Sequence, residues 1–250
     1  EAVAPAGQGQ APSAEAVAPA GQGQAPGPGA PLTEGTDYNR VPVRVTLSPD
    51  DPARPVELVY VFWYGCGTCR KLDPAVDQYL RSLPGDVRAF KIHAMYEPNT
   101  LWMTHARLFW TLETLGKEEE LHQAIFAEVQ DKGGTDPESG HAMAGLTDPE
   151  SMARFAESKG IPREEFAAAW NSPETEQKFR KALDYISNLD LDAVPGMGVN
   201  GRYAFSISKG GAGRFFETAQ RLIEDERGSL PDGGGASTEA APSGPPAEQE

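Results

Sequence analysis

The sequence is poor in cysteine, in positive charge and in long apolar runs, and each shortage excludes a class of site or of binding partner. Only 2 of the 250 residues are cysteine, so no second C-x-x-C pair exists to complete a four-thiolate zinc site. No apolar run approaches the roughly 18 residues that cross a bilayer as a helix. Lys and Arg number 22 against 37 Asp and Glu, a formal net charge of -15. We therefore expect no binding to nucleic acid or to anionic lipid surfaces.

Both ends of the chain lack large apolar side chains. The segment EAVAPAGQGQAP at 1–12 recurs letter for letter at 15–26, in too few copies to stack into a solenoid. Residues 1–35 and 229–250 cannot bury enough surface to offset the entropy of ordering, so we expect both segments to be disordered. One folded domain is then expected at 36–228.

Between these ends, strand and helix patterns alternate. The β-branched and aromatic runs at 56–63 and 87–94 predict two buried strands. Apolar residues at helical spacing predict a helical insertion at about 98–188. The pair Asn200–Gly201 predicts a hairpin, because a type I′ turn needs a positive φ at both central positions. An amphipathic helix at 213–227 completes an α/β fold with inserted helices.

Both cysteines lie in one motif, FWYGCGTC at 62–69, just after an apolar run and before a helical pattern. At a helix N-terminus, unpaired backbone N–H groups and the helix dipole stabilise a thiolate, which makes Cys66 the reactive thiol. Cys69 lies about one helical turn further on the same side and is placed to close a disulfide with Cys66. Gly67 is expected to keep this turn tight. The motif predicts a redox-active pair.

Other uses of two close cysteines are also considered. A structural disulfide across two residues closes so short a loop that it stabilises the fold little. Half of a metal site is the other alternative, since C-x-x-C often supplies two zinc ligands. The four histidines, His93, His105, His122 and His141, do not form an H-x(3–5)-H pair. A non-enzymatic module that binds metal through its thiols stays open on the residues alone.

Four stretches, FWYGCGTC, KIHAMYEP, LHQAIFAEVQDKG and VPGMGVNGRY, together resemble the DsbA family of periplasmic disulfide oxidoreductases. The resemblance spans about 35–228 and implies a thioredoxin fold with an inserted helical domain. It also implies that Pro195 is cis and packs against the active-site disulfide, while Val194 offers backbone groups to a client peptide by strand-like pairing. Lys91 is implied to lie beneath the disulfide.

The residues between the cysteines depart from the family's common C-P-H-C pattern. Gly67 and Thr68 replace the proline and the histidine, and that histidine helps to hold the thiolate. A less stabilised Cys66 thiolate makes the disulfide a weaker oxidant. We expect the Thr68 hydroxyl to donate a hydrogen bond to this thiolate as a partial replacement.

A second departure concerns proton transfer. Tyr60 stands six positions before the first cysteine, where the family tends to bury an acidic residue. Proton transfer at Cys69 is then expected to fall to Glu57, or to Lys91 with water.

The expected activity is thiol-disulfide exchange that oxidises client thiols through the Cys66–Cys69 pair, with no cofactor. An apolar surface made by Trp63 and Tyr64, together with Val194 and Met197, is expected to hold the unfolded clients, whereas Phe62 is expected to fill the core. The alternative for Trp63 and Tyr64 is that they fill the core as well. A reductase or an isomerase on the same fold would use the same two cysteines, so the direction stays open. The N-terminal segment is unsuited to dimerisation, which predicts a monomer.

The cell compartment and the redox partner follow from this chemistry. A dithiol oxidant in a reducing cytosol would be kept reduced, so we expect an exported, periplasmic protein with cysteine-containing exported clients. The sequence starts at Glu1 with neither Met nor a basic segment followed by an apolar one, as expected if a signal peptide is absent. The family resemblance implies reoxidation by a DsbB-like membrane quinone reductase.

Overall fold

The computed structural model describes residues 29–95, 100–132, 134–135, 142–143 and 146–229. Most of the two segments expected to be disordered lies outside these residues. The folded unit begins at Pro31, because Leu32 packs against the core and the Pro31 carbonyl accepts a hydrogen bond from Arg214. These contacts lie inside the segment 1–35, and the expected division of the chain at residues 35 and 228 stays a prediction.

A five-stranded sheet of order β1-β7-β6-β2-β3 forms the centre of the domain. Strands β2 and β3 are parallel, and the other neighbouring pairs are antiparallel. Every residue of β2 is buried, which accounts for its mostly apolar sequence, since such a strand is covered on both faces. The strands are β1 (Asn39–Arg40), β2 (Val56–Phe62), β3 (Val87–His93), β6 (Gly196–Val199) and β7 (Tyr203–Ser206).

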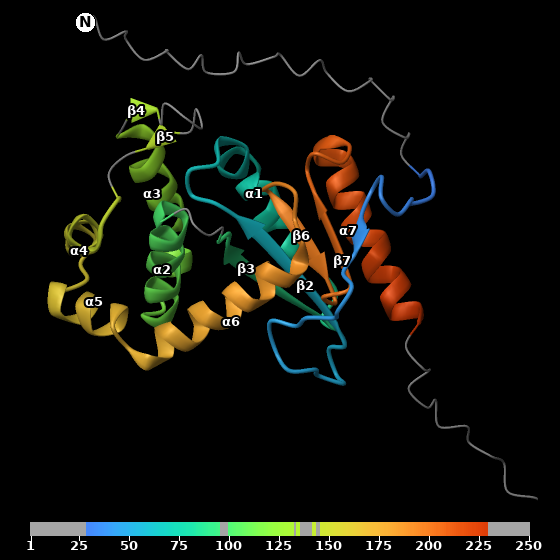
Figure 1. Ribbon diagram of the computed structural model, residues 1–250, viewed down its shortest axis with the longest axis horizontal. Helices are drawn as coiled ribbons and strands as arrows, with labels where there is room; N and C mark the ends of the chain where they lie inside the picture. The colour runs from blue at the N-terminus through green and yellow to red at the C-terminus, as the bar shows by residue number, and fades with distance from the viewer. Residues whose placement is uncertain (1–28, 96–99, 133, 136–141, 144–145, 230–250) are drawn as a thin grey trace, which may run out of the picture. The chain divides into compact units, whose positions relative to one another are not determined.

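Three helices pack on this sheet: α1 (Gly67–Ser82), α6 (Pro173–Leu189) and α7 (Gly211–Gly228). Helices α1 and α7 touch through the rings of Tyr79 and Phe216, whose centroids are 5.0 Å apart. Helix α6 lies so close to β6 that a Cβ atom on Gly198 would collide with Tyr185 and Leu189. The order β2-α1-β3 followed by β6-β7-α7 is that of a thioredoxin fold (Figure 1).

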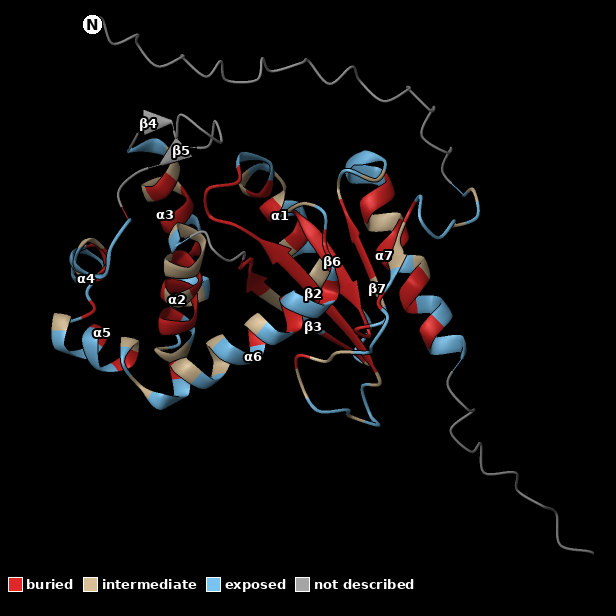
Figure 2. Ribbon diagram, in the orientation of Figure 1, coloured by how far each residue is buried: buried red, intermediate tan, exposed pale blue. Residues whose placement is uncertain are grey.

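The insertion between β3 and β6 is mainly helical, as predicted. Its helices α2 to α5 gather beside the sheet in Figure 1, and Figure 2 shows many exposed residues on α4 and α5, whereas α2 is mostly buried or intermediate. None of the helices in the described part of the chain is both long and apolar enough to cross a membrane. Before α6, the insertion contains α2 (Thr100–Thr114), α3 (Glu118–Asp131), β4 (Gly134–Thr135), β5 (Ala142–Met143), α4 (Pro149–Ser158) and α5 (Arg163–Trp170).

The predicted hairpin at Asn200–Gly201 joins β6 to β7. Asn200 and Gly201 have φ values of 50° and 57°. At Gly201, a Cβ atom would overlap the backbone of Val45, so both φ and space favour glycine. The Asn200 side chain accepts a hydrogen bond from the Glu57 N–H at 2.8 Å and donates one to Glu226 at 2.6 Å.

Candidate active site

The disulfide between Cys66 and Cys69 lies at the N-terminus of α1. Cys66 is the N-cap residue, and its Sγ accepts a hydrogen bond from the Cys69 N–H at 3.0 Å. The two Cα atoms are 5.2 Å apart, within the range that disulfides adopt. Cys66 is 7% exposed and Cys69 is 0% exposed. A thiolate from another protein therefore reaches Cys66 first.

The two residues between the cysteines are exposed on the first turn of α1. Gly67 has an ordinary φ, and a Cβ atom there would meet nothing within 4 Å, so the turn does not require glycine and that expectation is wrong. The donor to the Cys66 sulfur in this oxidised form is the Cys69 backbone N–H. The role of Thr68 toward a reduced thiolate stays a prediction.

The loop before β6 lies against the disulfide. The Val194–Pro195 peptide bond is cis, as the family resemblance implied. The Val194 carbonyl oxygen is 3.8 Å from Cys66 Sγ, and the Val194 side chain is half-buried. This carbonyl therefore lies beside the sulfur that a client attacks.

The aromatic residues before the motif do not form a client-binding surface. Trp63 is 2% exposed and Tyr64 is 0% exposed. Trp63 stacks on Trp102 of α2 with ring centroids 4.3 Å apart, and a Cβ atom on Gly65 would collide with the Trp63 indole. Met197 and Phe62 are likewise fully buried. These side chains fill the core between the sheet and the insertion, so of the predicted surface only Val194 remains partly accessible.

A buried carboxylate lies one turn beyond the disulfide. Asp73, four residues after Cys69, is fully buried, and its Oδ1 lies 3.1 Å from both Lys91 Nζ and His122 Nε2. Burial raises the pKa of Asp73, but the hydrogen bonds and charges of His122 and Lys91 outweigh burial and hold this pKa below its ordinary value. Asp73 is thus ionised and is held by one cation from α3 and one from β3.

His122 connects α3 both to α1 and to the loop before the cysteines. Its Nδ1 is 2.5 Å from Glu118 Oε1 and 3.3 Å from the Tyr64 hydroxyl, which itself donates to Glu118 at 3.1 Å. Burial lowers the pKa of His122, but the hydrogen bonds to Asp73 and Glu118 outweigh it and raise this pKa above its ordinary value. A protonated His122 can donate from both ring nitrogens to the two carboxylates.

Neither proton-transfer residue expected from the sequence touches the disulfide. Glu57 is the second residue of β2, and the motif starts at the other end of this strand, about 16 Å away at 3.3 Å per residue. Its carboxylate accepts hydrogen bonds from the N–H groups of Leu47 and Ser48, both at 2.9 Å, and faces Arg88. The expectation for Glu57 is therefore wrong. The hydroxyl of Tyr60 is buried and has no hydrogen-bond partner among the described residues.

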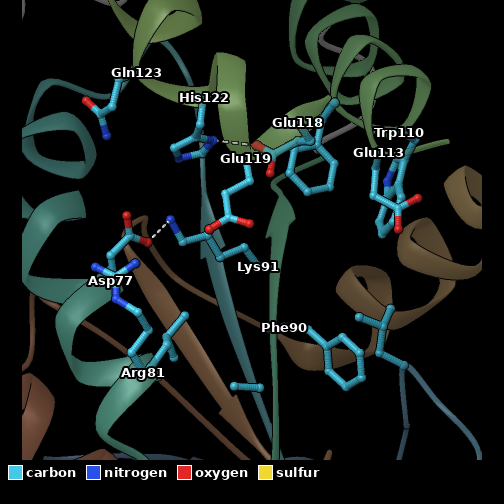
Figure 3. A pocket seen from close by; sticks show the side chains of 14 residues that line it. Asp77, Arg81, Phe90, Lys91, Trp110, Glu113, Glu118, Glu119, His122 and Gln123 are labelled. Atoms are coloured by element: carbon cyan, nitrogen blue, oxygen red, sulfur yellow. Dashed lines mark hydrogen bonds and ion pairs between the residues drawn. The ribbon is translucent and has the colours of Figure 1, made fainter. Parts of the chain in front are cut away.

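Lys91 bridges Asp73 and Asp77 on α1, which places it about one turn past the cysteines. Figure 3 shows Lys91 and Asp77 facing Glu118 and His122 of α3 across a cavity of about 460 Å³. A space of this size admits water molecules. Proton transfer through Lys91 and water stays a prediction.

A side chain at the end of α3 bonds to the backbone of the cysteine motif. The Gln130 side-chain amide, at the end of α3, donates hydrogen bonds to the carbonyl oxygens of Tyr64 and Cys66 at 2.7 and 3.3 Å. Beside it, Asp131 forms a bidentate ion pair with Arg70 of α1 at 2.6 and 2.9 Å. Sequence reasoning did not single out Gln130 or Asp73. Only Asp73 carried a signal, because a residue four positions after Cys69 shares its helix face.

Known proteins match the chain in sequence and in structure, although no protein-family model matches it. The thiol:disulfide interchange protein DsbA of Pseudomonas syringae pv. tomato is 32% identical over 202 residues, which cover 79% of this chain and 86% of that protein. The protein of the same name from Azotobacter vinelandii is 33% identical over 199 residues, with the same two coverages. The crystal structure of Pseudomonas aeruginosa DsbA superposes with a TM-score of 0.67 at 31% identity, covering 79% of this chain and 95% of that one. With the disulfide at the helix N-terminus and the cis-proline loop beside it, these matches show that the chain belongs to the DsbA family of thiol:disulfide interchange proteins.

Proposed function

We propose that this protein works as an oxidase that donates its disulfide to pairs of cysteines in unfolded, exported client proteins. The observation that supports this direction is the asymmetry of the disulfide. Cys66 is 7% exposed and its Sγ already accepts the Cys69 N–H at 3.0 Å, whereas Cys69 is 0% exposed. After reduction, the Cys66 thiolate still has the Cys69 N–H donor and the positive end of the α1 dipole beside it, and both stabilise its charge. Because they favour the reduced protein, they make the disulfide a stronger oxidant.

The exchange proceeds in two balanced steps. In the first, a client thiolate attacks Cys66 Sγ, forming a client–Cys66 disulfide and breaking the Cys66–Cys69 bond, whose electron pair leaves on Cys69. In the second, another client thiolate attacks the client sulfur of this mixed disulfide, and Cys66 leaves as a thiolate. The client loses two electrons, and the protein gains them.

The cis-proline loop supplies a place for the client backbone. The Val194 carbonyl lies 3.8 Å from the attacked sulfur. The N–H of Val194 is a second backbone group at the same position, so the two can pair with an extended client segment as neighbouring strands do. This pairing is independent of client sequence, which suits a protein that acts on many unfolded chains.

The proposal also covers how the protein is reoxidised, its oligomeric state and its cell compartment. The reduced protein returns its two electrons to a DsbB-like membrane quinone reductase, works as a monomer and acts in the periplasm. A periplasmic site is favoured because the reducing cytosol would hold the pair as dithiol.

Disulfide transfer to a reduced, unfolded two-cysteine peptide tests the proposal. Without any other oxidant, the oxidised protein is expected to form about one peptide disulfide per protein molecule, because each carries a single exchangeable disulfide. Cys66→Ala protein is the control and is expected to transfer none. The proposal is wrong if the equilibrium runs the other way, so that reduced protein takes the disulfide from the oxidised peptide.

A further inference from the structure

We propose that Gln130, on the inserted helix α3, is a positioning residue that sets the thiolate affinity of Cys66. The inference deepens the proposed function, since the same exchange depends on that thiolate. It comes from a side chain that belongs to the insertion and yet bonds directly to the backbone of the cysteine motif.

The Gln130 amide nitrogen connects two carbonyl groups of the motif. It lies 2.7 Å from the Tyr64 oxygen and 3.3 Å from the Cys66 oxygen. The Cys66 carbonyl also accepts the Arg70 N–H at 3.1 Å, the first hydrogen bond of α1. Among the described residues, the Tyr64 carbonyl has no other donor. Gln130 therefore bonds to one peptide plane before the N-cap residue and to the one that follows it, and orients both.

Neighbouring contacts hold Gln130 in place. Val129 is 1% exposed, and the Phe126 ring packs edge-on against the Tyr64 ring with centroids 5.1 Å apart. Asp131 binds Arg70, the residue after Cys69, through two hydrogen bonds. The last turn of α3 is thus tied to the first turn of α1, and the amide has little freedom to leave the two carbonyls.

This arrangement acts on Cys66 in two ways. Carbonyl oxygens carry partial negative charge, and a donor bonded to them reduces the repulsion that they exert on a nearby thiolate. The same donor keeps Cys66 in the extended backbone conformation of an N-cap, with φ −84° and ψ 110°, in which Sγ receives the Cys69 N–H. Loss of the amide removes both effects, so the pKa of the Cys66 thiol rises and the disulfide becomes a weaker oxidant.

The matched experiment uses Gln130→Met and Asp131→Asn in the full chain. Methionine keeps the length and helix preference of glutamine but cannot donate. Asparagine at 131 weakens the link between α3 and α1 but leaves the amide at 130. For each reduced protein, the thiolate absorbance is titrated against pH, and the dithiol–disulfide equilibrium is measured against glutathione.

Gln130→Met is expected to raise the Cys66 pKa and to shift the glutathione equilibrium toward the oxidised protein by about three- to tenfold, the worth of one net hydrogen bond. Asp131→Asn frees the Arg70 cation and is expected to leave the pKa unchanged or lower it. An unchanged pKa and equilibrium in Gln130→Met, or equal shifts in both variants, would overturn the inference. If Gln130→Met does not fold, Gln130→Glu replaces it in the experiment. Glutamate keeps the shape of glutamine and adds a negative charge, so the Cys66 pKa should rise further than in Gln130→Met.

Both readouts are taken without a client, so they are separable from the proposed function. If the wild-type protein transfers no disulfide to a peptide while Gln130→Met still shifts the pKa, the oxidase proposal fails and the positioning role stands. If transfer occurs and the pKa does not respond to Gln130→Met, the positioning role fails and the oxidase proposal stands.

Discussion

Replacement of Cys69 with alanine is expected to make a mixed disulfide between Cys66 and a single-cysteine client persist at least about a thousandfold longer than in the wild-type protein. In the wild type, Cys69 is held 5.2 Å from Cys66, Cα to Cα. Because a single-cysteine client has no second thiol, Cys69 is expected to reverse the first step by attacking the Cys66 sulfur, which releases the client with its thiol. An intramolecular thiol in this geometry has an effective concentration far above that of free thiols in solution. Without it, the adduct waits for an external thiol.

The adduct is made from Cys69→Ala protein that carries glutathione on Cys66, because the client thiolate then displaces glutathione and no other oxidant is needed. Its lifetime is followed by intact-protein mass and by electrophoresis without reductant. Cys66→Ala protein is the control and should give no adduct. A Cys69→Ala adduct that decays as fast as that of the wild type would show that Cys69 does not resolve the mixed disulfide.

The second large effect concerns His122. His122→Gln is expected to lower the free energy of unfolding by about 2–3 kcal/mol in mildly acidic solution, because Asp73 and Glu118 lose charge-assisted hydrogen bonds from the buried cation between them. The folded-state pKa of His122 is raised, so its contribution is fully present below the unfolded pKa of about 6.5 and is lost as the pH rises through the folded pKa. The difference between wild type and variant should therefore shrink in alkaline solution.

Denaturant unfolding of both proteins from about pH 5.5 to about pH 9 measures this difference. His105→Gln is the matched control. His105 Nε2 donates a hydrogen bond to the Leu146 carbonyl oxygen at 2.9 Å, and burial lowers the pKa of His105 to about 4. Because the folded-state pKa of His105 is lowered, neutral His105 contributes its full stability above about pH 6.5, and this contribution is lost as the pH falls. The loss of unfolding free energy caused by His105→Gln should therefore become smaller toward low pH. A His122→Gln cost that does not change with pH would contradict the ion-pair network.

Local patterns in the sequence predicted much of the fold because the forces involved are local. The apolar run at 56–63 is a buried central strand, β2, and Asn200–Gly201 forms the turn that its backbone preference dictates. The C-x-x-C spacing and the helical pattern behind it placed the disulfide at a helix N-terminus. In each case the residues that cause the structure are neighbours in the chain.

Contacts between distant segments escaped prediction. The fold begins at Pro31 partly because Arg214, 177 positions from Asp37, forms a buried ion pair with it at 2.7 Å. Composition alone cannot show that one ion pair anchors a Pro- and Gly-rich segment.

The aromatic residues of the motif show the same limit. The sequence predicted a client surface at Trp63 and Tyr64. In the structure, Trp102 of α2 packs on Trp63 and Phe126 of α3 packs on Tyr64. A sequence pattern shows that a side chain is apolar and does not show which inserted helix will bury it. The Gln130 contacts to the motif are long-range in the same way, since they join residues more than 60 positions apart.

The most direct test of the oxidase proposal is the reduction potential of the Cys66–Cys69 pair, equilibrated with glutathione and followed by tryptophan fluorescence, with Trp63 as the nearby reporter. Because the motif lacks the family's histidine but keeps the helix N-terminus and the Cys69 N–H donor, we expect a potential between about -120 mV, that of a strong oxidase, and about -180 mV. A potential near about -270 mV, that of thioredoxin, would contradict the proposal and make the protein a reductant of its clients.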